Sequence, residues 1–220
     1  MSLSIALSRG VTLGRTLDLL QAAGLDVSAV RGERRQGVIA LPGGALALVT
    51  TAHDVPVYVE SGAAAVGVVG KEVLLERRGS VHELLDLRLG RSRLVYAEPA
   101  ARPAGRGTDR RLRVATKYPL TARRYFASSG RQVVIVDLHG PVDTAPRLGI
   151  ADGVVDLVRS GRTLAAAGLE VREEIAVCSQ RLIAGRAARA LFAAEIDDLL
   201  KALRAAVAAA GEQPGAVAGS

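Results

Sequence analysis

Aromatic residues are scarce in this chain. They make up only 3% of its 220 residues, and tryptophan is missing altogether. We therefore predict an aliphatic core, and the length suffices for one large domain or two small ones. Cysteine is equally scarce, because Cys178 is the only one. A single cysteine excludes an internal disulfide and a thiolate metal cluster, so neither is expected to hold the fold together.

Long uncharged apolar runs are also missing. No stretch approaches the roughly 20 residues that a membrane-spanning helix needs, and the first residues do not resemble a signal peptide. We therefore expect a cytoplasmic protein without membrane association. The net charge of +7 is compatible with nucleic-acid binding. However, the arginines are dispersed and no aromatic residues lie among them to stack on bases. We expect no nucleic-acid partner, and a GC-rich genome explains much of the excess charge.

Short apolar runs alternate with helix-like segments along most of the chain. Val154–Val158, for example, is a predicted strand, and a predicted helix follows from Thr163 to Ala167. This order predicts an α/β protein with two α/β lobes and a central cleft, like the periplasmic binding proteins. In open parallel sheets, ligands bind at the carboxyl ends of the strands. The predicted binding loops follow Leu7, Val69, Ala115, Val136 and Val158.

The lobe boundaries are predicted from composition. Residues 98–111 are rich in proline, glycine and arginine, which is typical of a linker between lobes. We assign residues 1–97 to the first part of lobe I and residues 98–175 to lobe II. Residues 176–210 would return to lobe I, and residues 211–220 would form a disordered tail.

The segment 149–164 is the most informative one, because an apolar strand leads into Ser160-Gly161-Arg162-Thr163 and then a helix. Gly161 lets the backbone approach an anion, and the amides and dipole at a helix start favour negative charge. The hydroxyls of Ser160 and Thr163 would add two donors, while Asp152 and Asp156 would accept hydrogen bonds from sugar hydroxyls. A sugar phosphate therefore fits better than phosphate alone. The alternative is an ordinary turn in which Ser160 caps the helix.

This segment resembles the signature of the ATP phosphoribosyltransferases, which catalyse the first step of histidine biosynthesis. The matching residues are Gly149, Ala151, Asp156, Ser160, Gly161, Thr163 and Leu164, with Asp143 where the family has Glu. Further motifs match in the family's order at residues 5–10, 54–74 and 113–126. The resemblance covers about residues 3–185. Because the chain has 220 residues, it is similar to the short form of the family.

The resemblance implies an enzyme that joins N1 of ATP to C1 of phosphoribosyl pyrophosphate and releases pyrophosphate. Such a reaction needs cations and Mg²⁺, carried with the substrates, at the leaving group, and carboxylates near the ribose. No metal site of the protein itself is expected, because the histidines are scattered. The implied catalytic residues are Arg9, Lys71, Asp152 and Asp156. The implied substrate-binding residues are Ser160, Gly161, Arg162, Thr163, Tyr118, Lys117, Glu72 and Arg91.

Several of the implied roles have a structural alternative. Arg9 and Lys71 would neutralise phosphates, or they are solvated surface charges. Tyr118 would stack on adenine, or it packs in the core. Either Asp152 or Asp156 could be a strand-end residue bonded to the backbone.

The resemblance also implies partners. The short form lacks the histidine-sensing domain and works with a regulatory subunit that resembles histidyl-tRNA synthetase. We therefore expect ATP and phosphoribosyl pyrophosphate as ligands, and both a homo-oligomer and a hetero-oligomer with such a subunit. Some residues depart from the family pattern, because Thr51 and His53 replace cations and Ala65 replaces a carboxylate. Three alternatives remain open: a catalytically weak paralogue, a scaffold subunit, and a nucleotide- or anion-binding protein without chemistry.

Overall fold

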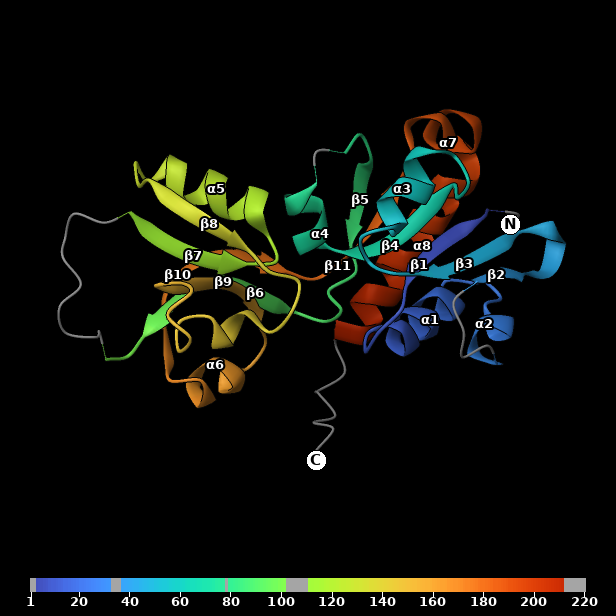
Figure 1. Cartoon of the computed structure of the whole chain (residues 1–220). Helices are drawn as coiled ribbons and strands as arrows, with labels where there is room; N and C mark the ends of the chain where they lie inside the picture. Colours follow the sequence, from blue (N-terminus) through green and yellow to red (C-terminus); the bar gives the residue numbers. More distant parts are fainter. Residues whose placement is uncertain (1–2, 33–36, 78, 102–110, 212–220) are drawn as a thin grey trace. The chain divides into compact units, whose positions relative to one another are not determined.

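The computed structural model describes residues 3–32, 37–77, 79–101 and 111–211 (Figure 1). The chain divides into two compact units. The first unit contains residues 1–74, 79–90 and 179–220, and the second contains residues 75–78 and 91–178. Each unit is built around its own β-sheet. The predicted α/β class with two α/β lobes is therefore confirmed.

The sheet of the first unit has the strand order β2-β3-β1-β4-β11-β5. Its strands are β1 (Ile5–Ser8), β2 (Gly37–Ala40), β3 (Leu46–Thr50), β4 (Val66–Gly70), β5 (His82–Asp86) and β11 (Gln180–Ala184). The central strands β3, β1 and β4 are parallel, whereas β2 and β11 run antiparallel to their neighbours. The carboxyl ends of β1, β3 and β4 therefore lie at one edge.

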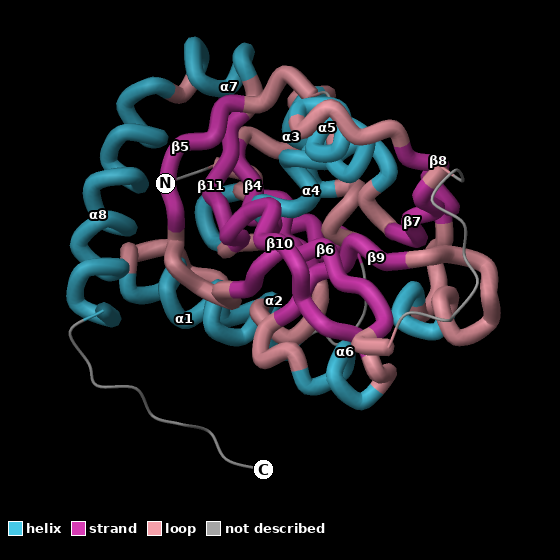
Figure 2. The backbone as a smooth tube through the Cα atoms, turned by 90° about the vertical axis from the view of Figure 1, so that its left-hand side faces the viewer, coloured by secondary structure: helices cyan, strands magenta, loops and turns pink. Residues whose placement is uncertain are grey.

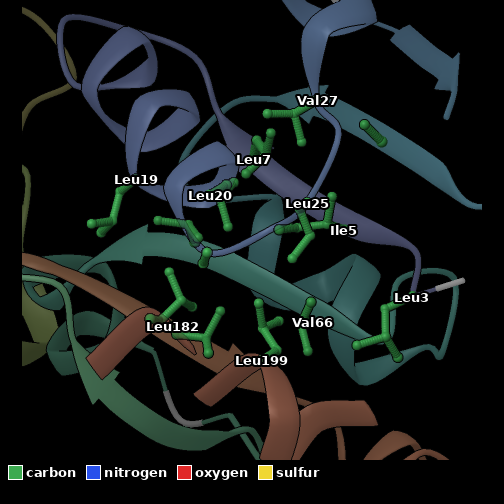
Figure 3. Packing of buried hydrophobic residues seen from close by; sticks show 14 of the residues in the cluster. Leu3, Ile5, Leu7, Leu19, Leu20, Leu25, Val27, Val66, Leu182 and Leu199 are labelled. Carbon is green, nitrogen blue, oxygen red and sulfur yellow. The ribbon is translucent and has the colours of Figure 1, made fainter. Parts of the chain in front are cut away.

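The helices of the first unit bury aliphatic side chains against this sheet. They are α1 (Leu13–Ala22), α2 (Ser28–Gly32), α3 (Val55–Glu60), α4 (Lys71–Glu76, whose last two residues belong to the second unit), α7 (Arg186–Leu191) and α8 (Ala193–Gly211). Figure 3 shows Leu20 of α1 and Leu199 of α8 converging with Leu7 and Leu182 from the strands. All four side chains are fully buried. Burial of such a side chain contributes about 1.5–3 kcal/mol, so the aliphatic core predicted from the composition stabilises this unit.

The sheet of the second unit has the strand order β10-β6-β9-β7-β8. Its strands are β6 (Ser92–Pro99), β7 (Leu112–Thr116), β8 (Val133–Asp137), β9 (Gly153–Val158) and β10 (Leu169–Cys178). Strands β9, β7 and β8 are parallel, and β6 pairs antiparallel with both β9 and β10. Figures 1 and 2 show α5 (Pro119–Ser128) and α6 (Arg162–Ala166) on opposite faces of this sheet. A core cluster lies under each of these helices.

The predicted lobe boundaries need correction. The first predicted crossing, between residues 97 and 98, falls inside β6, which pairs along its length with β9 and β10 of the second sheet. The chain instead crosses between Gly90 and Arg91, and it returns between Cys178 and Ser179. The predicted linker 98–111 therefore connects two strands of the same sheet. Residues 212–220 of the predicted tail lie outside the described residues, whereas Gly211 ends α8.

Most of the aromatic residues gather in the second unit. Phe126 lies edge-to-face against Tyr96 and Tyr125, with ring centroids 5.1 and 5.4 Å apart. The guanidinium carbon of Arg131 lies 4.6 Å from the centroid of the Phe126 ring. Both carboxylate oxygens of Glu173 accept hydrogen bonds from Arg131, at 2.6 and 2.7 Å, and Tyr125 also donates to Glu173. A bidentate ion pair thus holds a cation over the aromatic cluster.

This ion pair makes stability depend on pH. The hydrogen bonds from Arg131 lower the pKa of Glu173. The contribution of this ion pair to the free energy of unfolding is therefore complete above the ordinary glutamate range, and it is lost as pH falls through the lowered pKa. We expect Glu173→Gln to cost about 1 kcal/mol at pH 7, because the pair is partly exposed, and to flatten the acid loss of stability. Urea unfolding between pH 7 and pH 3 measures both effects. Glu170→Gln, which alters the more exposed pair with Arg172, is the control; equal pH profiles for wild type and Glu173→Gln would contradict the prediction.

Candidate functional site

Three parallel strands of the second unit end at the same edge of their sheet. Thr116, at the end of β7, lies opposite Asp137 of β8 and Val155 of β9. The segments that follow these strands therefore leave from one edge. Strand β6 begins at this edge, because Arg93 lies opposite Val158 in the antiparallel pair. The register thus brings the predicted phosphate turn, Lys117 and the start of β6 to one place.

The predicted phosphate turn is open to solvent. Ser160, Arg162 and Thr163 are exposed, and the Ser160 hydroxyl accepts a hydrogen bond from Arg162 Nε at 3.3 Å. The residue that caps α6 is Gly161 and not Ser160, and no side chain caps this helix. The first amides of a helix have no partner within the helix. The alternative in which Ser160 caps the helix is therefore wrong.

Gly161 is required by the shape of the turn. Its φ of +77° lies in the left-handed region, and a Cβ at this position would meet no atom within 4 Å. The backbone conformation, and not crowding, therefore favours glycine. Ser160 and Arg162, on either side of Gly161, are exposed, and no side chain caps the start of α6. This arrangement matches an anion-binding helix start.

Asp156 lies on β9, two residues before the end of that strand. Burial raises its pKa, a hydrogen bond from the Leu157 amide at 2.8 Å lowers it, and the nearby charges of Lys117 and Asp143 act in opposite directions. The carboxylate is thus largely desolvated and close to one cation and one further carboxylate. Such perturbed groups are frequent at functional sites. Asp156 therefore remains a candidate site residue.

Asp152 has a different environment. Its Oδ2 accepts hydrogen bonds from the Arg113 amide at 2.9 Å and from Arg113 Nε at 3.3 Å, and its Oδ1 accepts one from Nη2 at 3.0 Å. These bonds raise the pKa of Arg113. Asp152 also precedes β9, so it lies at the amino edge of the sheet, away from the phosphate turn. The structure favours the alternative role, a residue that ties the backbone of β7.

Tyr118 does not present an open ring. Only 9% of its surface is exposed, and it packs in the core cluster with Leu94, Ala122 and Phe126. Its amide donates to the Thr116 hydroxyl at 2.9 Å. The predicted stacking on adenine is therefore not supported, because the ring is already covered by aliphatic and aromatic neighbours.

Lys117 and Arg91 are exposed near the phosphate turn. Lys117 follows the last residue of β7 and is close enough to Asp156 to lower the pKa of that carboxyl. Arg91 precedes β6, so it lies beyond Val158 at the edge from which the turn leaves. Both remain candidates for phosphate binding.

The other predicted residues belong to the first unit. Arg9 and Lys71 follow the neighbouring parallel strands β1 and β4. Arg9 is exposed, and Lys71 Nζ forms an ion pair with Glu83 at 2.5 Å. The Glu72 carboxylate lies over Gly70, where a Cβ would be 2.0 Å from Oε1. These residues follow strands at the carboxyl edge of the first sheet.

The departures from the family pattern lie at different edges of the first sheet. The Thr51 hydroxyl donates to Asp54 at 2.6 Å, immediately after the carboxyl end of β3. Ala65 instead precedes β4 and is only 4% exposed, so it lies at the amino edge. The carboxylate missing at Ala65 would therefore not face the edge that carries Arg9 and Lys71.

Sequence reasoning missed a small cavity beside the phosphate turn. It has a volume of about 240 Å³, and its lining residues are Asp143, Thr144, Arg147, Thr163, Ala166 and Ala167. Asp143 lies in a short 3₁₀ helix (Val142–Thr144) that follows β8. Asp143 was noted only as a family match, and Thr144 and Arg147 were not considered. The sequence signal for this cavity was a pair of charged residues, Asp143 and Arg147, which lie four residues apart after the end of a strand.

Among the described residues, no three His, Cys, Asp or Glu side chains lie close enough together to form a metal site. In the same part of the chain, no helix has the length and apolar character needed to cross a membrane.

The chain is similar to proteins of one family. Residues 51–205 match the family model described as HisG: ATP phosphoribosyltransferase. A protein of Pseudomonas aeruginosa (strain UCBPP-PA14) named ATP phosphoribosyltransferase is 44% identical over 210 residues, covering 94% of this chain and 98% of its own. A protein with the same name from Rubrobacter xylanophilus is 44% identical over 204 residues, covering 90% and 93%. The solved "ATP phosphoribosyl transferase (HisG:HisZ) complex from Thermotoga maritima" has a TM-score of 0.79 and 28% identity, covering 94% and 99%.

Proposed function

The chain belongs to the ATP phosphoribosyltransferase family, and we propose that its Gly161 turn holds the 5-phosphate of phosphoribosyl pyrophosphate. As a member of this family, it is an enzyme that transfers the phosphoribosyl group to N1 of ATP and releases pyrophosphate. This reaction is the first step of histidine biosynthesis. The observation that carries the proposed phosphate site is the exposed, uncapped start of α6 behind Gly161.

Asp156 is the group proposed to face the ribose. Positive charge develops on the ribose ring as the bond from C1 to pyrophosphate breaks, and a desolvated carboxylate interacts with that charge more strongly than a hydrated one. The nearby carboxylate of Asp143 and the ammonium of Lys117 set the local field. The leaving pyrophosphate gains negative charge, and we propose that Arg9, Lys71 and Arg91 contribute cations to the phosphates.

Mg²⁺ is proposed to arrive with the substrates. In such a complex the ion keeps water molecules and phosphate oxygens as ligands. Bound to the pyrophosphate, Mg²⁺ would neutralise the charge of this leaving group.

A regulatory partner is proposed from the Thermotoga maritima structure, which is a complex of HisG with HisZ. We propose that this chain forms a homo-oligomer and assembles with a second subunit of that kind. Light scattering of the chain alone, and mixed with the subunit from the same organism, measures both. A mass that stays unchanged on mixing would exclude the hetero-oligomer.

The proposed function is tested by direct assay. We expect the chain to form phosphoribosyl-ATP from ATP and phosphoribosyl pyrophosphate with Mg²⁺, and to do so faster with the regulatory subunit. The formation of product is followed by its ultraviolet absorbance, and the binding of each substrate by calorimetry. Binding without turnover under either condition would favour the catalytically weak paralogue that Thr51 and His53 suggest. Binding of neither substrate would contradict the proposed site.

A further inference from the structure

Glu76 places a buried carboxylate at the start of helix α5. Only 9% of this residue is exposed. Its Oε1 accepts a hydrogen bond from the Leu120 amide at 2.8 Å, and its Oε2 accepts bonds from the Thr121 amide at 2.9 Å and the Thr121 hydroxyl at 2.8 Å. The residue that precedes the helix, Tyr118, makes no side-chain cap of its own. A carboxylate more than forty residues away in the sequence therefore caps this helix.

The cap satisfies the whole first turn of α5. Pro119 is the first helical residue and has no amide hydrogen. The next two amides, of Leu120 and Thr121, both donate to Glu76. An anion at this position is also favoured by the helix dipole. Inorganic anions and substrate phosphates are thereby excluded from the start of α5.

The segment that carries Glu76 is firmly placed in the second unit. Residues 75–78 belong to that unit, although the chain on both sides belongs to the first. The preceding residue, Leu75, packs against the same core cluster as Phe126 of α5. Glu76 is thus anchored beside the helix that it caps.

The turn between β7 and α5 is fixed from both ends. On the strand side, the Thr116 hydroxyl accepts a hydrogen bond from the Tyr118 amide at 2.9 Å. On the helix side, Glu76 holds the amides of Leu120 and Thr121. Exposed Lys117, whose charge acts on Asp156, lies within this turn. The position of the Lys117 backbone therefore depends on the Glu76 carboxylate.

We infer that Glu76 is a positioning residue of the second unit: it holds the turn that carries Lys117, and it occupies the amides of α5 so that the 5-phosphate binds only at α6. This inference rests on the proposed function for its kinetic consequences. Two helices, α5 and α6, start after parallel strands of the same sheet. The start of the longer one, which would attract anions, is filled by an internal carboxylate, whereas that of α6 has no side-chain cap.

Kinetics of Glu76 variants test the positioning role. Glu76→Gln keeps the shape of the side chain but replaces one acceptor oxygen by a donor NH₂ group. We expect the KM for phosphoribosyl pyrophosphate to rise on the order of 10-fold to 100-fold. The measurement is made well below the unfolding temperature. Glu173→Gln, which removes another carboxylate of the same unit, controls for lost stability and should leave this KM unchanged. Glu76→Ala should recover part of its activity in acetate, since acetate can enter the vacated place. An unchanged KM in Glu76→Gln would overturn the positioning role.

Thermal unfolding tests the same inference without turnover. We expect inorganic sulfate to raise the Tm of Glu76→Ala by more than it raises that of the wild type or of Glu173→Gln, because the vacated amides accept an anion. If sulfate raises the Tm of Glu76→Ala by more, and the wild type binds neither substrate, the proposed function is contradicted. The same result would still support the inference that Glu76 occupies the first amides of α5. Equal sulfate effects in all three proteins would overturn the inference.

Discussion

Asp156→Asn is expected to lower kcat/KM by about 100-fold or more while raising the thermal stability of the ligand-free protein. The loss of activity follows from removal of the negative charge proposed to face the developing ribose cation. The gain in stability follows from the burial that raises the pKa of Asp156, since an ionised carboxylate is costly there. Asparagine keeps the oxygen that accepts the Leu157 amide, which lies 2.8 Å from Oδ1.

The pH dependence has a definite sign. A raised pKa in the folded state means that the protonated form of Asp156 is favoured by folding, so stability is lost as pH rises through that pKa. Asp156→Asn should remove this loss. If the ionised form is the active one, the acid limb of kcat/KM for the wild type lies above the ordinary aspartate range. Unfolding curves and pH–rate profiles measure the two effects.

Asp152→Asn is the matched comparison, because sequence alone gives both aspartates the same role. The Asp152 carboxylate accepts three hydrogen bonds from Arg113, so the variant should be less stable than the wild type. We expect the two variants to change Tm in opposite directions. If both lowered Tm, the assignment of Asp156 as the desolvated, functional carboxylate would be contradicted.

Gly161→Ala is expected to raise the KM for phosphoribosyl pyrophosphate by about 100-fold. Its φ of +77° is unfavourable for alanine by about 1–2 kcal/mol. Relief of this strain would rotate the amides at the start of α6 away from the phosphate. The KM for ATP should change much less, because the turn is proposed to bind only the 5-phosphate.

Gly168→Ala provides the control for strain. Gly168 follows the other end of α6 with φ of +72°, and a Cβ there also meets no atom within 4 Å. Both variants should lose similar stability, and only Gly161→Ala should weaken substrate binding. Calorimetric titration with phosphoribosyl pyrophosphate and Mg²⁺ measures the binding directly. Equal affinities in the two variants would exclude the α6 turn as the phosphate site.

Local patterns predicted the elements that form from neighbouring residues. Val154–Val158 lies within β9, and the turn at Gly161 has the left-handed conformation that glycine permits. The position and conformation of the turn proposed to bind phosphate were therefore predictable from the sequence. The resemblance to a family then supplied the reaction, which charge and periodicity alone left open.

Features that depend on pairing between distant residues were not predicted. The membership of β6 in the second sheet depends on its hydrogen bonds to β9 and β10, which no local pattern contains. Asp152 and Asp156 were indistinguishable until their partners were known. The burial of Tyr118 depends on the packing of α5 and β6, which the sequence does not show. Stacking on adenine was therefore predicted for a ring that is covered in the structure. The cap formed by Glu76 joins residues 44 and 45 positions apart.

The interleaved course of the chain has a consequence for its synthesis. Strand β4 pairs with β11, whose residues 180–184 are made more than a hundred residues later. A nascent chain leaving the ribosome therefore holds β4 without that neighbour until the whole second unit, which ends at Cys178, has been translated. We therefore expect the second unit to fold first, although the first unit contains the N-terminus. Until β11 is made, we expect chaperones to protect the unpaired edge of β4 from aggregation.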